Sequence, residues 1–489
     1  MAYLKDLLKQ VTYICTRGTM DCKVTHICHD SRQVVRGSMF ICLAGSREDG
    51  HDYLAQAIRK GAAVCVVSKH VWVEGDVTVI RVRNTSEAMA WIARNYYGAP
   101  AEAMQMIGIT GTKGKTTTAC MLYQMLKEAG VKCGLIGTLG VRRSDGLKKA
   151  GSNTTPDALV LQKELREMAD AGCSCCVMEV SSQGLKMHRV AGIVFDYGIF
   201  TNLSPDHIGP NEHASFEEYQ ECKSLLFRQC KEGIVNADDE HVDGIIKNHT
   251  CKLHTFSCKK DADLMAGAVG YLDEEGQIGM HFTTTGCMNV YAVVHIPGSF
   301  SVYNSLVTML TCHLAGISDE AILRGLDKVK VRGRVELVPV SKDFTVIIDY
   351  AHNEVSTRSV LTTLKEYHPK RLICVYGGGG NRSKLRRYDM GEVTGELADL
   401  SVLTCDNPRD EEIRDINNDI KIGLAKSNGK YIEIDDRKAA IKYCIENAKK
   451  GDMIVLLGKG HEDYQEIKGV KYHFDEREAI AEIKKELNL

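Results

Sequence analysis

Short, nearly uninterrupted apolar runs alternate with longer amphipathic stretches through the middle of the chain. Between residues 101 and 330 the apolar runs predict buried strands at 104–109, 133–137, 175–180 and 197–202. A stretch between two of them, 159–171, places Leu161, Leu165 and Met168 on one face of a helix. Apolar strands separated by helices are typical of a mostly parallel sheet that is covered on both faces. The pattern therefore predicts an α/β fold.

The pattern changes near both ends of this region, which predicts three domains. Residues 1–98 carry a short strand at 38–43 and helical stretches at 53–60 and 86–97, followed by Gly98-Ala-Pro100 as a linker. A new series of strands follows residue 331, at 344–349, 372–376, 400–404 and 453–457. We expect a smaller N-terminal α/β domain (1–98), a central domain with a P-loop ATPase-like parallel sheet (99–330), and a C-terminal Rossmann-like domain (331–489) without Gly-x-Gly-x-x-Gly.

The composition argues against several classes of partner. The chain has 62 basic and 64 acidic residues, so its net charge of −2 gives no reason to expect a nucleic acid or an anionic membrane. No apolar run approaches the roughly 18 residues of a membrane span, and the charged N-terminus is unlike a signal peptide, so we expect a cytoplasmic protein. Most of the 19 cysteines, Cys173 and Cys176 included, sit in apolar runs, which favours reduced core thiols over a zinc site.

The strongest motif is Gly108-Ile-Thr-Gly-Thr-Lys-Gly-Lys-Thr-Thr-Thr118, which lies between a predicted strand and a predicted helix. Its small residues allow backbone N–H groups to curl around a polyphosphate, Lys115 adds a positive charge, and Thr116 offers a hydroxyl to Mg²⁺. Its glycine spacing differs from the common GTPase layout, and the chain has no Asn-Lys-x-Asp motif. We therefore expect ATP as the nucleotide.

Three residues of the central domain are further candidates for the nucleotide site. Glu179 closes an apolar strand and could hold the Mg²⁺ that touches Thr116, although such a residue can also cap the next element. His207 follows the next strand, where a ligand or catalytic role competes with a structural one. Lys223 lies in a helical pattern, and by itself this pattern favours an exposed lysine.

Three strand ends of the C-terminal domain carry polar clusters. The loop at 377–384 combines four glycines with cations that continue to Arg387, which suits an anionic ligand, although a solvated loop is the alternative. In Asp406-Asn-Pro-Arg409 the arginine could bind a carboxylate while Asp406 and Asn407 take an ammonium group, or the segment could be a simple proline turn. The cluster at 458–462, Gly-Lys-Gly-His-Glu, is equally open when taken alone.

Taken in order, these pieces resemble the Mur ligases over nearly the whole chain. The likeness runs through His29-Asp-Ser-Arg32, residues 108–118, Asn153-Thr-Thr-Pro156, Glu179-Val-Ser-Ser182, residues 201–207, Lys223, Asp349-Tyr-Ala-His352, Asp406-Asn-Pro-Arg409 and Gly458-Lys-Gly-His-Glu462. The resemblance implies an ATP-dependent acid–amino-acid ligase of peptidoglycan precursor synthesis. The carboxylate of UDP-MurNAc-L-Ala-D-Glu would attack the γ-phosphate of ATP, and the acyl phosphate would then react with the amine of a diamino acid.

The resemblance also implies roles for individual residues. Lys115, His207 and Lys223 would be catalytic, with two Mg²⁺ sites held by Thr116, Glu179, His207 and a carbamylated Lys223. ATP would contact Gly111, Thr112, Lys113, Gly114, Lys115, Thr116, Thr117, Asn304 and Asp349. The nucleotide sugar with its dipeptide would contact Ser31, Asn153, Thr154, Thr155, Ser181 and Arg189. The incoming amino acid would contact Arg387, Asp406, Asn407, Pro408, Arg409, Gly458 and Glu462.

Several positions depart from the family pattern, and they bear mainly on the acceptor amino acid. The Asp-Asn-Pro-Arg form resembles the relatives that add meso-diaminopimelate, whereas lysine-adding relatives lack this arginine. However, Gly378, Asn381 and Ser383 replace usual Cys and Asp residues, and Asn353-Glu-Val355 replaces Thr-Pro-Asp. L-Lysine or another amine as acceptor, and a nucleotide-binding paralogue that has lost ligation, therefore remain alternatives. A folylpolyglutamate-type relative fits the N-terminal region less well.

Overall fold

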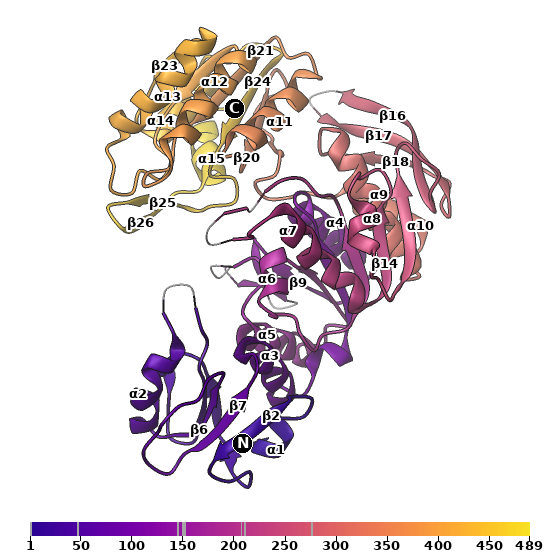
Figure 1. The fold of residues 1–489 in the computed structure, drawn as a ribbon. Helices are drawn as coiled ribbons and strands as arrows, with labels where there is room; N and C mark the ends of the chain where they lie inside the picture. The colour runs from indigo at the N-terminus through magenta and orange to yellow at the C-terminus, as the bar shows by residue number, and fades with distance from the viewer. Residues whose placement is uncertain are drawn as a thin grey trace. The chain divides into compact units, whose positions relative to one another are not determined.

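The computed structural model describes residues 2–45, 48–143, 146–148, 153–206, 208–209, 212–274 and 277–489 (Figure 1). The chain divides into two compact units, of which the first comprises Met1–Met265, Gly286–Met288 and Leu306–Gly325. The second comprises Ala266–Thr285, Asn289–Ser305 and Leu326–Leu489. The predicted domain boundaries at residues 98/99 and 330/331 stay predictions. Among the described residues, no helix is both long and apolar enough to cross a membrane.

The N-terminal part of the first unit is a five-stranded sheet in the order β2-β7-β6-β5-β4. Strands β4 to β7 are parallel, and β2 pairs antiparallel at the edge. Asn84 begins the long helix of this part by accepting hydrogen bonds from the backbone N–H groups of Ser86 and Glu87. The elements are β1 (Ala2–Tyr3), α1 (Leu4–Leu7), β2 (Tyr13–Arg17), β3 (Lys23–Val24), β4 (His26–Cys28), β5 (Ser38–Ile41), α2 (Leu54–Arg59), β6 (Ala62–Val67), β7 (Thr78–Val82) and α3 (Thr85–Tyr96).

The central sheet has eleven strands in the order β11-β10-β9-β12-β8-β13-β14-β15-β16-β17-β18. Its middle, from β9 to β15, is parallel as predicted, while β10 and β11 on one side and β17 and β18 on the other pair antiparallel. The strands are β8 (Gln105–Thr110), β9 (Cys133–Gly137), β10 (Gly140–Arg143), β11 (Gly146–Lys148), β12 (Cys175–Glu179), β13 (Phe195–Phe200), β14 (Cys230–Asn236), β15 (Lys252–Ser257), β16 (Leu264–Glu274), β17 (Gln277–Gly286) and β18 (Tyr291–Val294).

Alternate residues of the central strands pack against helices. Met106, Ile136 and Met178 join a cluster with Leu165 and Met168 of the helix predicted at 159–171, and Cys173 and Cys176 are buried in the same core. The helix that follows the phosphate loop contacts β8, β9 and β12. The helices are α4 (Lys115–Glu128), α5 (Ala158–Asp170), α6 (Ser182–Lys186), α7 (Phe216–Ser224), α8 (Val242–Ile246), α9 (Ser299–Leu314) and α10 (Asp319–Asp327).

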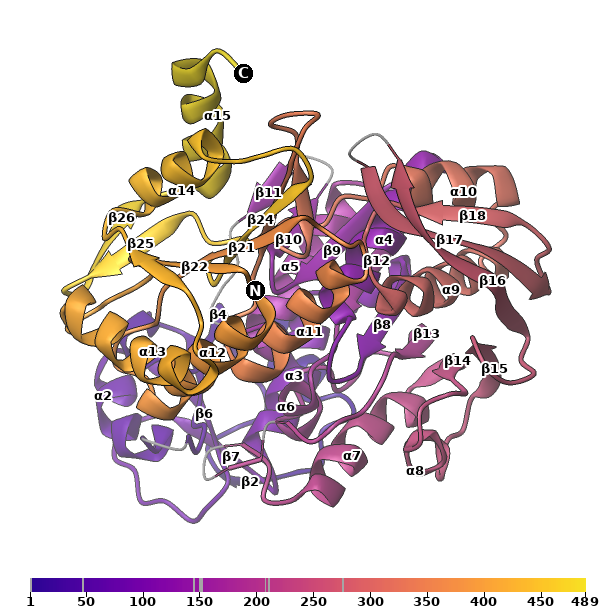
Figure 2. The same cartoon turned by 90° about the horizontal axis from the view of Figure 1, so that it is seen from above.

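The C-terminal sheet lies in the second unit and has the order β19-β20-β24-β21-β22-β23, with every pair parallel except β19–β20. Helices α11, α12 and α13 supply one core cluster and α14 and α15 another, so the sheet has two covered faces, and α12 lies beside α13 (Figure 2). The elements are β19 (Glu336–Val338), β20 (Thr345–Asp349), α11 (Glu354–Lys365), β21 (Arg371–Tyr376), α12 (Lys384–Leu397), β22 (Leu400–Leu403), α13 (Ile413–Ser427), β23 (Tyr431–Glu433), α14 (Arg437–Glu446), β24 (Asp452–Leu457), β25 (Tyr464–Ile467), β26 (Val470–His473) and α15 (Glu476–Leu487).

Candidate active site

The predicted phosphate loop joins β8 to α4, as its sequence indicates. Gly111 has φ +150°, and a Cβ there would lie 2.0 Å from Oγ1 of Thr201, so the loop can form only with glycine at this place. Lys115 is the first residue of α4, and its Nζ donates hydrogen bonds to the carbonyl oxygens of Gly111 (2.8 Å) and Thr112 (3.1 Å). The loop therefore holds the lysine ammonium close to its own backbone at the N-terminus of a 14-residue helix.

Thr116 and Glu179 meet beside this loop. The parallel pairing of β8 with β12 sets Glu179 opposite Ile109, just before the loop. Thr116 Oγ1 donates to Glu179 Oε2 at 2.9 Å, and the backbone N–H of Thr138 donates to Oε1 at 2.8 Å. A hydroxyl beside a carboxylate that is only 2% exposed is an all-oxygen donor set of the kind that Mg²⁺ prefers. These two side chains thus fit the predicted ion.

Lys223 is buried, with 1% of its surface exposed, which corrects the exposed position that its helical pattern alone favoured. It lies on α7, where Tyr219 precedes it by one turn and its Nζ sits 4.4 Å from that ring. Nζ also donates to the carbonyl oxygen of Gly111 at 2.8 Å. Burial, and next the charge of Lys115, lower the pKa of Lys223 well below its usual range, while Asp206 acts in the opposite direction.

Lys115, Thr116, Glu179 and Lys223 therefore gather around one loop. His207, the remaining predicted member of this group, lies outside the described residues. In the described part of the chain, no three His, Cys, Asp or Glu side chains form a metal-binding cluster. The predicted ligands Thr116 and Lys223 are not among these four residue types. The candidate metal site therefore consists of the Thr116–Glu179 pair and the buried amine of Lys223.

The residues predicted for the nucleotide-sugar dipeptide surround the end of β12. Thr155 Oγ1 donates to the carbonyl oxygen of Glu179 at 3.0 Å and accepts from the backbone N–H of Ser181 at 2.9 Å. Arg189 Nη1 donates to the carbonyl oxygen of Thr155 at 2.9 Å, and the hydroxyl of Thr154 lies 3.0 Å from that of Thr138. Asn153 precedes this group in the chain.

Ser31 lies elsewhere in the same unit, in the short 3-10 helix Ser31–Gln33 that follows β4. Its side chain is buried and donates a hydrogen bond to Gln56 Oε1 at 2.9 Å. This position is the carboxyl end of a parallel strand, where ligands of α/β sheets bind.

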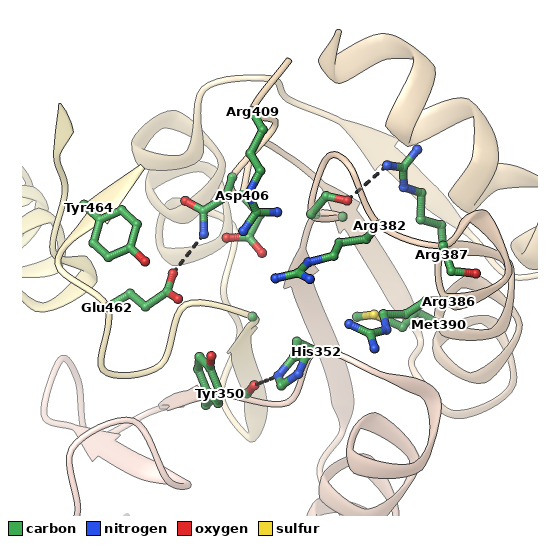
Figure 3. A pocket seen from close by; sticks show the side chains of 16 residues that line it. Tyr350, His352, Arg382, Arg386, Arg387, Met390, Asp406, Arg409, Glu462 and Tyr464 are labelled. Carbon is green, nitrogen blue, oxygen red and sulfur yellow. Dashed lines mark hydrogen bonds between the residues drawn. The ribbon is translucent and has the colours of Figure 1, made fainter. Parts of the chain in front are cut away.

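In the second unit, the polar clusters converge on one pocket of about 230 Å³ (Figure 3). Its walls are the loops after β20, β21, β22 and β24, because the carboxyl ends of these parallel strands meet at the same edge of the sheet. Arg382, Arg386, Arg387 and Arg409 line the pocket together with the carboxylates of Asp406 and Glu462. The pocket therefore presents more positive than negative side chains.

Arg387 is held from behind by two carboxylates. Its Nη2 and Nη1 donate to Oε1 and Oε2 of Glu411 at 2.7 and 2.8 Å, and Nη1 also donates to Asp419 Oδ2 at 2.9 Å. The hydrogen bonds from Arg387 lower the pKa of Glu411 to about 2. Among the described residues, the Nε–H of Arg387 finds no hydrogen-bond acceptor.

Arg409 bridges two segments of the pocket wall. Its Nη1 donates to the carbonyl oxygen of Gly380 at 2.7 Å, and its Nε donates to Glu466 Oε2 at 3.1 Å. The backbone N–H of Arg409 donates to the carbonyl oxygen of Glu466, which stabilises the left-handed φ of +50° at the arginine. The hairpin of β25 and β26 thus fixes the arginine that the sequence singled out.

Asn304 and Asp349, predicted to touch the adenosine, belong to the second unit, whereas the phosphate loop belongs to the first. Asp349 accepts hydrogen bonds from the backbone N–H groups of Val335 and Ala351, both at 2.7 Å, so it braces the end of β20. Burial raises the pKa of its carboxyl. Asn304 is buried in α9.

The sequence interpretation assigned no role to Glu411, Asp419, Lys459 or Glu466, which contact the predicted pocket residues. Lys459 lies within the cluster at 458–462, and this position in the sequence could have indicated its role in the pocket. The other three lie 24 to 57 residues from their partners along the chain, and a local sequence pattern does not predict such distant pairs.

The chain is similar to known proteins over nearly its whole length. Three family models match successive parts of the chain: the Mur ligase family catalytic domain (residues 23–97), the Mur ligase middle domain (109–312) and the Mur ligase glutamate ligase domain (333–460). The chain is 41% identical to the UDP-N-acetylmuramoyl-L-alanyl-D-glutamate–2,6-diaminopimelate ligase of Clostridium tetani (strain Massachusetts / E88), over 99% of each chain. The corresponding ligase of Bacillus licheniformis is 40% identical over 98% of this chain and 100% of its own.

A solved structure of a UDP-N-acetylmuramoyl-L-alanyl-D-glutamate–2,6-diaminopimelate ligase matches with a TM-score of 0.71 and 29% identity, over 95% of this chain and 96% of that one. MurF from Acinetobacter baumannii shares the fold at 18% identity, with a TM-score of 0.60 over 99% of this chain and 98% of its own. The two curated relatives cover 98% and 99% of this chain at 40% and 41% identity. The protein belongs to the Mur ligase family.

Proposed function

We propose that this protein is an ATP-dependent ligase that joins meso-diaminopimelate to UDP-MurNAc-L-Ala-D-Glu in peptidoglycan precursor synthesis. The observation that carries the choice of acceptor is the pocket of the second unit, which is lined by Arg409 and Arg387 as well as by Asp406 and Glu462. A diamino diacid has a second carboxylate and a second ammonium group, and these suit the two kinds of side chain. The full-length likeness to diaminopimelate ligases supports the same choice.

On the nucleotide side, the substrate carboxylate must approach the γ-phosphate of ATP, and two anions repel each other. Lys115 and the N–H groups at the start of α4 would stabilise the phosphates, and the other predicted loop residues would position them. Thr116 and Glu179 would hold one Mg²⁺ ion, and a carbamylated Lys223 with His207 a second. When bound, these ions supply charge screening at the transferring phosphoryl group.

The surroundings of Lys223 support its carbamylation. A buried amine with a lowered pKa is neutral in a larger fraction of molecules, and the neutral amine is the form that reacts with carbon dioxide. In this step the amine nitrogen forms a bond to the carbon of carbon dioxide and releases one proton. The product is a carboxylate-like group close to the Gly111 carbonyl, which suits a divalent cation better than an ammonium does.

On the acceptor side, Arg409 would bind the distal carboxylate of the amino acid, and Asp406, Asn407 and Glu462 would surround its distal ammonium group. L-Lysine has no distal carboxylate, so the donors of Arg409 that are not taken by Glu466 and Gly380 would lack this acceptor when lysine binds. An unpaired charged donor costs roughly 1–3 kcal/mol or more, about 5- to 150-fold in discrimination.

On the nucleotide-sugar side, Ser31, Asn153, Thr154, Thr155, Ser181 and Arg189 would contact the substrate. In the same proposal, the domains have the boundaries predicted from the sequence and the reaction takes place in the cytoplasm.

The test is an acceptor panel scored by ADP release. With ATP, Mg²⁺ and UDP-MurNAc-L-Ala-D-Glu, we expect turnover that depends on meso-diaminopimelate and is at least tenfold lower in kcat/KM with L-lysine. Equal or better turnover with L-lysine contradicts the acceptor. ATP turnover that no amine stimulates contradicts the ligase and favours a nucleotide-binding paralogue. Arg358→Ala, on the exposed face of α11, is a matched control that should leave both values unchanged.

A further inference from the structure

One lysine of the second unit has its charged group completely enclosed. Lys459 follows β24, and its side chain is 0% exposed. Its Nζ donates hydrogen bonds to Asp406 Oδ1 at 3.2 Å and to Asn407 Oδ1 at 3.1 Å, and it lies 3.5 Å from Glu462 Oε2. A single ammonium group therefore touches three of the side chains that line the amino-acid pocket. Because a buried charge is stable only when it is paired, these contacts are obligatory for the folded chain.

The first consequence concerns the side-chain amide of Asn407. Its Oδ1 accepts from Lys459 Nζ and from the backbone N–H of Glu466, at 3.1 and 3.0 Å. With the oxygen taken by two donors, Nδ2 must face the other way, where it donates to Glu462 Oε2 at 2.9 Å (Figure 3). Lys459 and the backbone N–H of Glu466 thus together determine which end of the amide Glu462 meets, and Lys459 itself lies 3.5 Å from the Glu462 carboxylate.

The second consequence concerns Asp406. One carboxylate oxygen, Oδ1, binds Lys459, while the other, Oδ2, lies 2.9 Å from the place that a Cβ of residue 458 would occupy. Gly458 lines the pocket and has φ +105°, so the glycine leaves Oδ2 uncovered. Within this cluster the ammonium of Lys459 balances one of the two carboxylates, Asp406 and Glu462, so the three side chains together carry one negative charge.

We propose that Lys459 is a positioning residue that makes this pocket selective for an acceptor with a second ammonium group. It does so by holding Asp406 and, through Asn407, Glu462 in the orientation that receives this group. The inference rests on the proposed function and deepens it, since it names the residue on which recognition of the distal ammonium group depends. Without Lys459, Asp406 is a nearly buried carboxylate that has lost its hydrogen bond to the ammonium, and it is no longer held in this orientation.

The experiment compares two acceptors that differ by a single amino group: meso-diaminopimelate and 2-aminopimelate, which keeps both carboxylates and lacks the distal amine. The ratio of their kcat/KM values is measured for the full-length protein and for Lys459→Met, which removes the charge and keeps the length of the side chain. Lys438→Met is the matched control, because Lys438 forms an ion pair with Glu482 at 2.6 Å on the exposed face of α14.

We expect Lys459→Met to lower the ratio at least tenfold while the KM values for ATP and the nucleotide sugar change less than twofold. We expect Lys438→Met to leave the ratio unchanged. An unchanged or higher ratio overturns the proposal, as does a parallel rise in all three KM values, which is the mark of a merely structural lysine. If Lys459→Met does not fold, Lys459→Gln takes its place with the same expected fall and the same refuting outcomes. A wild-type protein without amine-dependent turnover contradicts the ligase function itself, so the two failures are distinguishable.

Discussion

Replacing Glu476 by glutamine tests a buried ion pair beneath the amino-acid pocket. Arg437 and Glu476 are both 0% exposed, and Nη2 and Nε of the arginine donate to Oε1 of the glutamate at 2.6 and 2.9 Å. Arg437 also donates to the carbonyl oxygens of Leu457 (2.8 Å) and Cys405 (3.3 Å), which lie at the ends of β24 and β22. The pair therefore ties together the two strands that carry Gly458 and Asp406.

The expected cost of Glu476→Gln follows from the enclosure of both partners. Removing one charge of a buried pair leaves the other uncompensated, which costs roughly 3–5 kcal/mol. Glutamine keeps the shape and one acceptor oxygen, so we expect the lower end, about 3 kcal/mol. This is a large part of the roughly 5–15 kcal/mol that holds a domain folded. Adding Arg437→Met should recover part of the loss, because no orphan charge remains.

Hydrogen exchange followed by mass spectrometry is the suitable assay, because the two tryptophans, Trp72 and Trp91, lie in the first unit and do not report on this sheet. Exchange in β22 and β24 should accelerate about 100-fold, since each 1.4 kcal/mol is about a factor of ten. Glu482→Gln breaks an exposed pair with Lys438 and should leave the exchange of β22 and β24 nearly unchanged, because water and salt screen such a pair. Acceleration below threefold in Glu476→Gln would refute the reasoning from burial.

Three further changes have defined outcomes. Lys115→Ala should abolish ATP turnover and keep the circular dichroism spectrum, because the lysine donates hydrogen bonds to carbonyl oxygens of the phosphate loop rather than to the core; residual turnover above 10% would contradict its role. Arg409→Ala should raise the KM for the diamino acid at least tenfold with little change for ATP, and an unchanged amino-acid KM would show that the arginine does not bind the acceptor. Burial, and then the charge of Arg334, lower the pKa of His461 to about 4. The unfolded chain therefore takes up this proton first, and the histidine should cost the wild type up to about 3 kcal/mol as pH falls from 6.5 to 4. The pH dependence of unfolding should be flatter in His461→Gln, and identical profiles would contradict the assignment.

The elements next to the site were predictable because their signals are local. The strand expected at 133–137 coincides with β9, and the helix expected at 159–171 is α5, Ala158–Asp170. Apolar alternation and glycine placement act within a few residues, so a single segment reveals them. The antiparallel strands at the edges of the central sheet were not predicted, because pairing at a sheet edge depends on distant neighbours.

Some contacts among the candidate site residues were predictable from the sequence, and others were not. Thr116 and Glu179 meet as the motif implied, because strand pairing brings two strand ends together. The burial of Lys223 follows from α7 packing against the loop, and helical periodicity alone could not show which side of this helix is covered. The partners of Arg387 and Arg409 lie in other elements, and long-range ion pairs have no sequence pattern.

The carbonyl oxygen of Gly111 accepts hydrogen bonds from both Lys115 and Lys223, each at 2.8 Å. Two amines from separate helices thus share a single anchor, and the tight glycine geometry keeps its peptide plane from turning. A substitution that rotates this peptide plane disturbs the hydrogen bonds of both amines, so the position of one lysine cannot change without affecting the other. The phosphate-binding turn and α7 must accordingly change in concert whenever either of them changes.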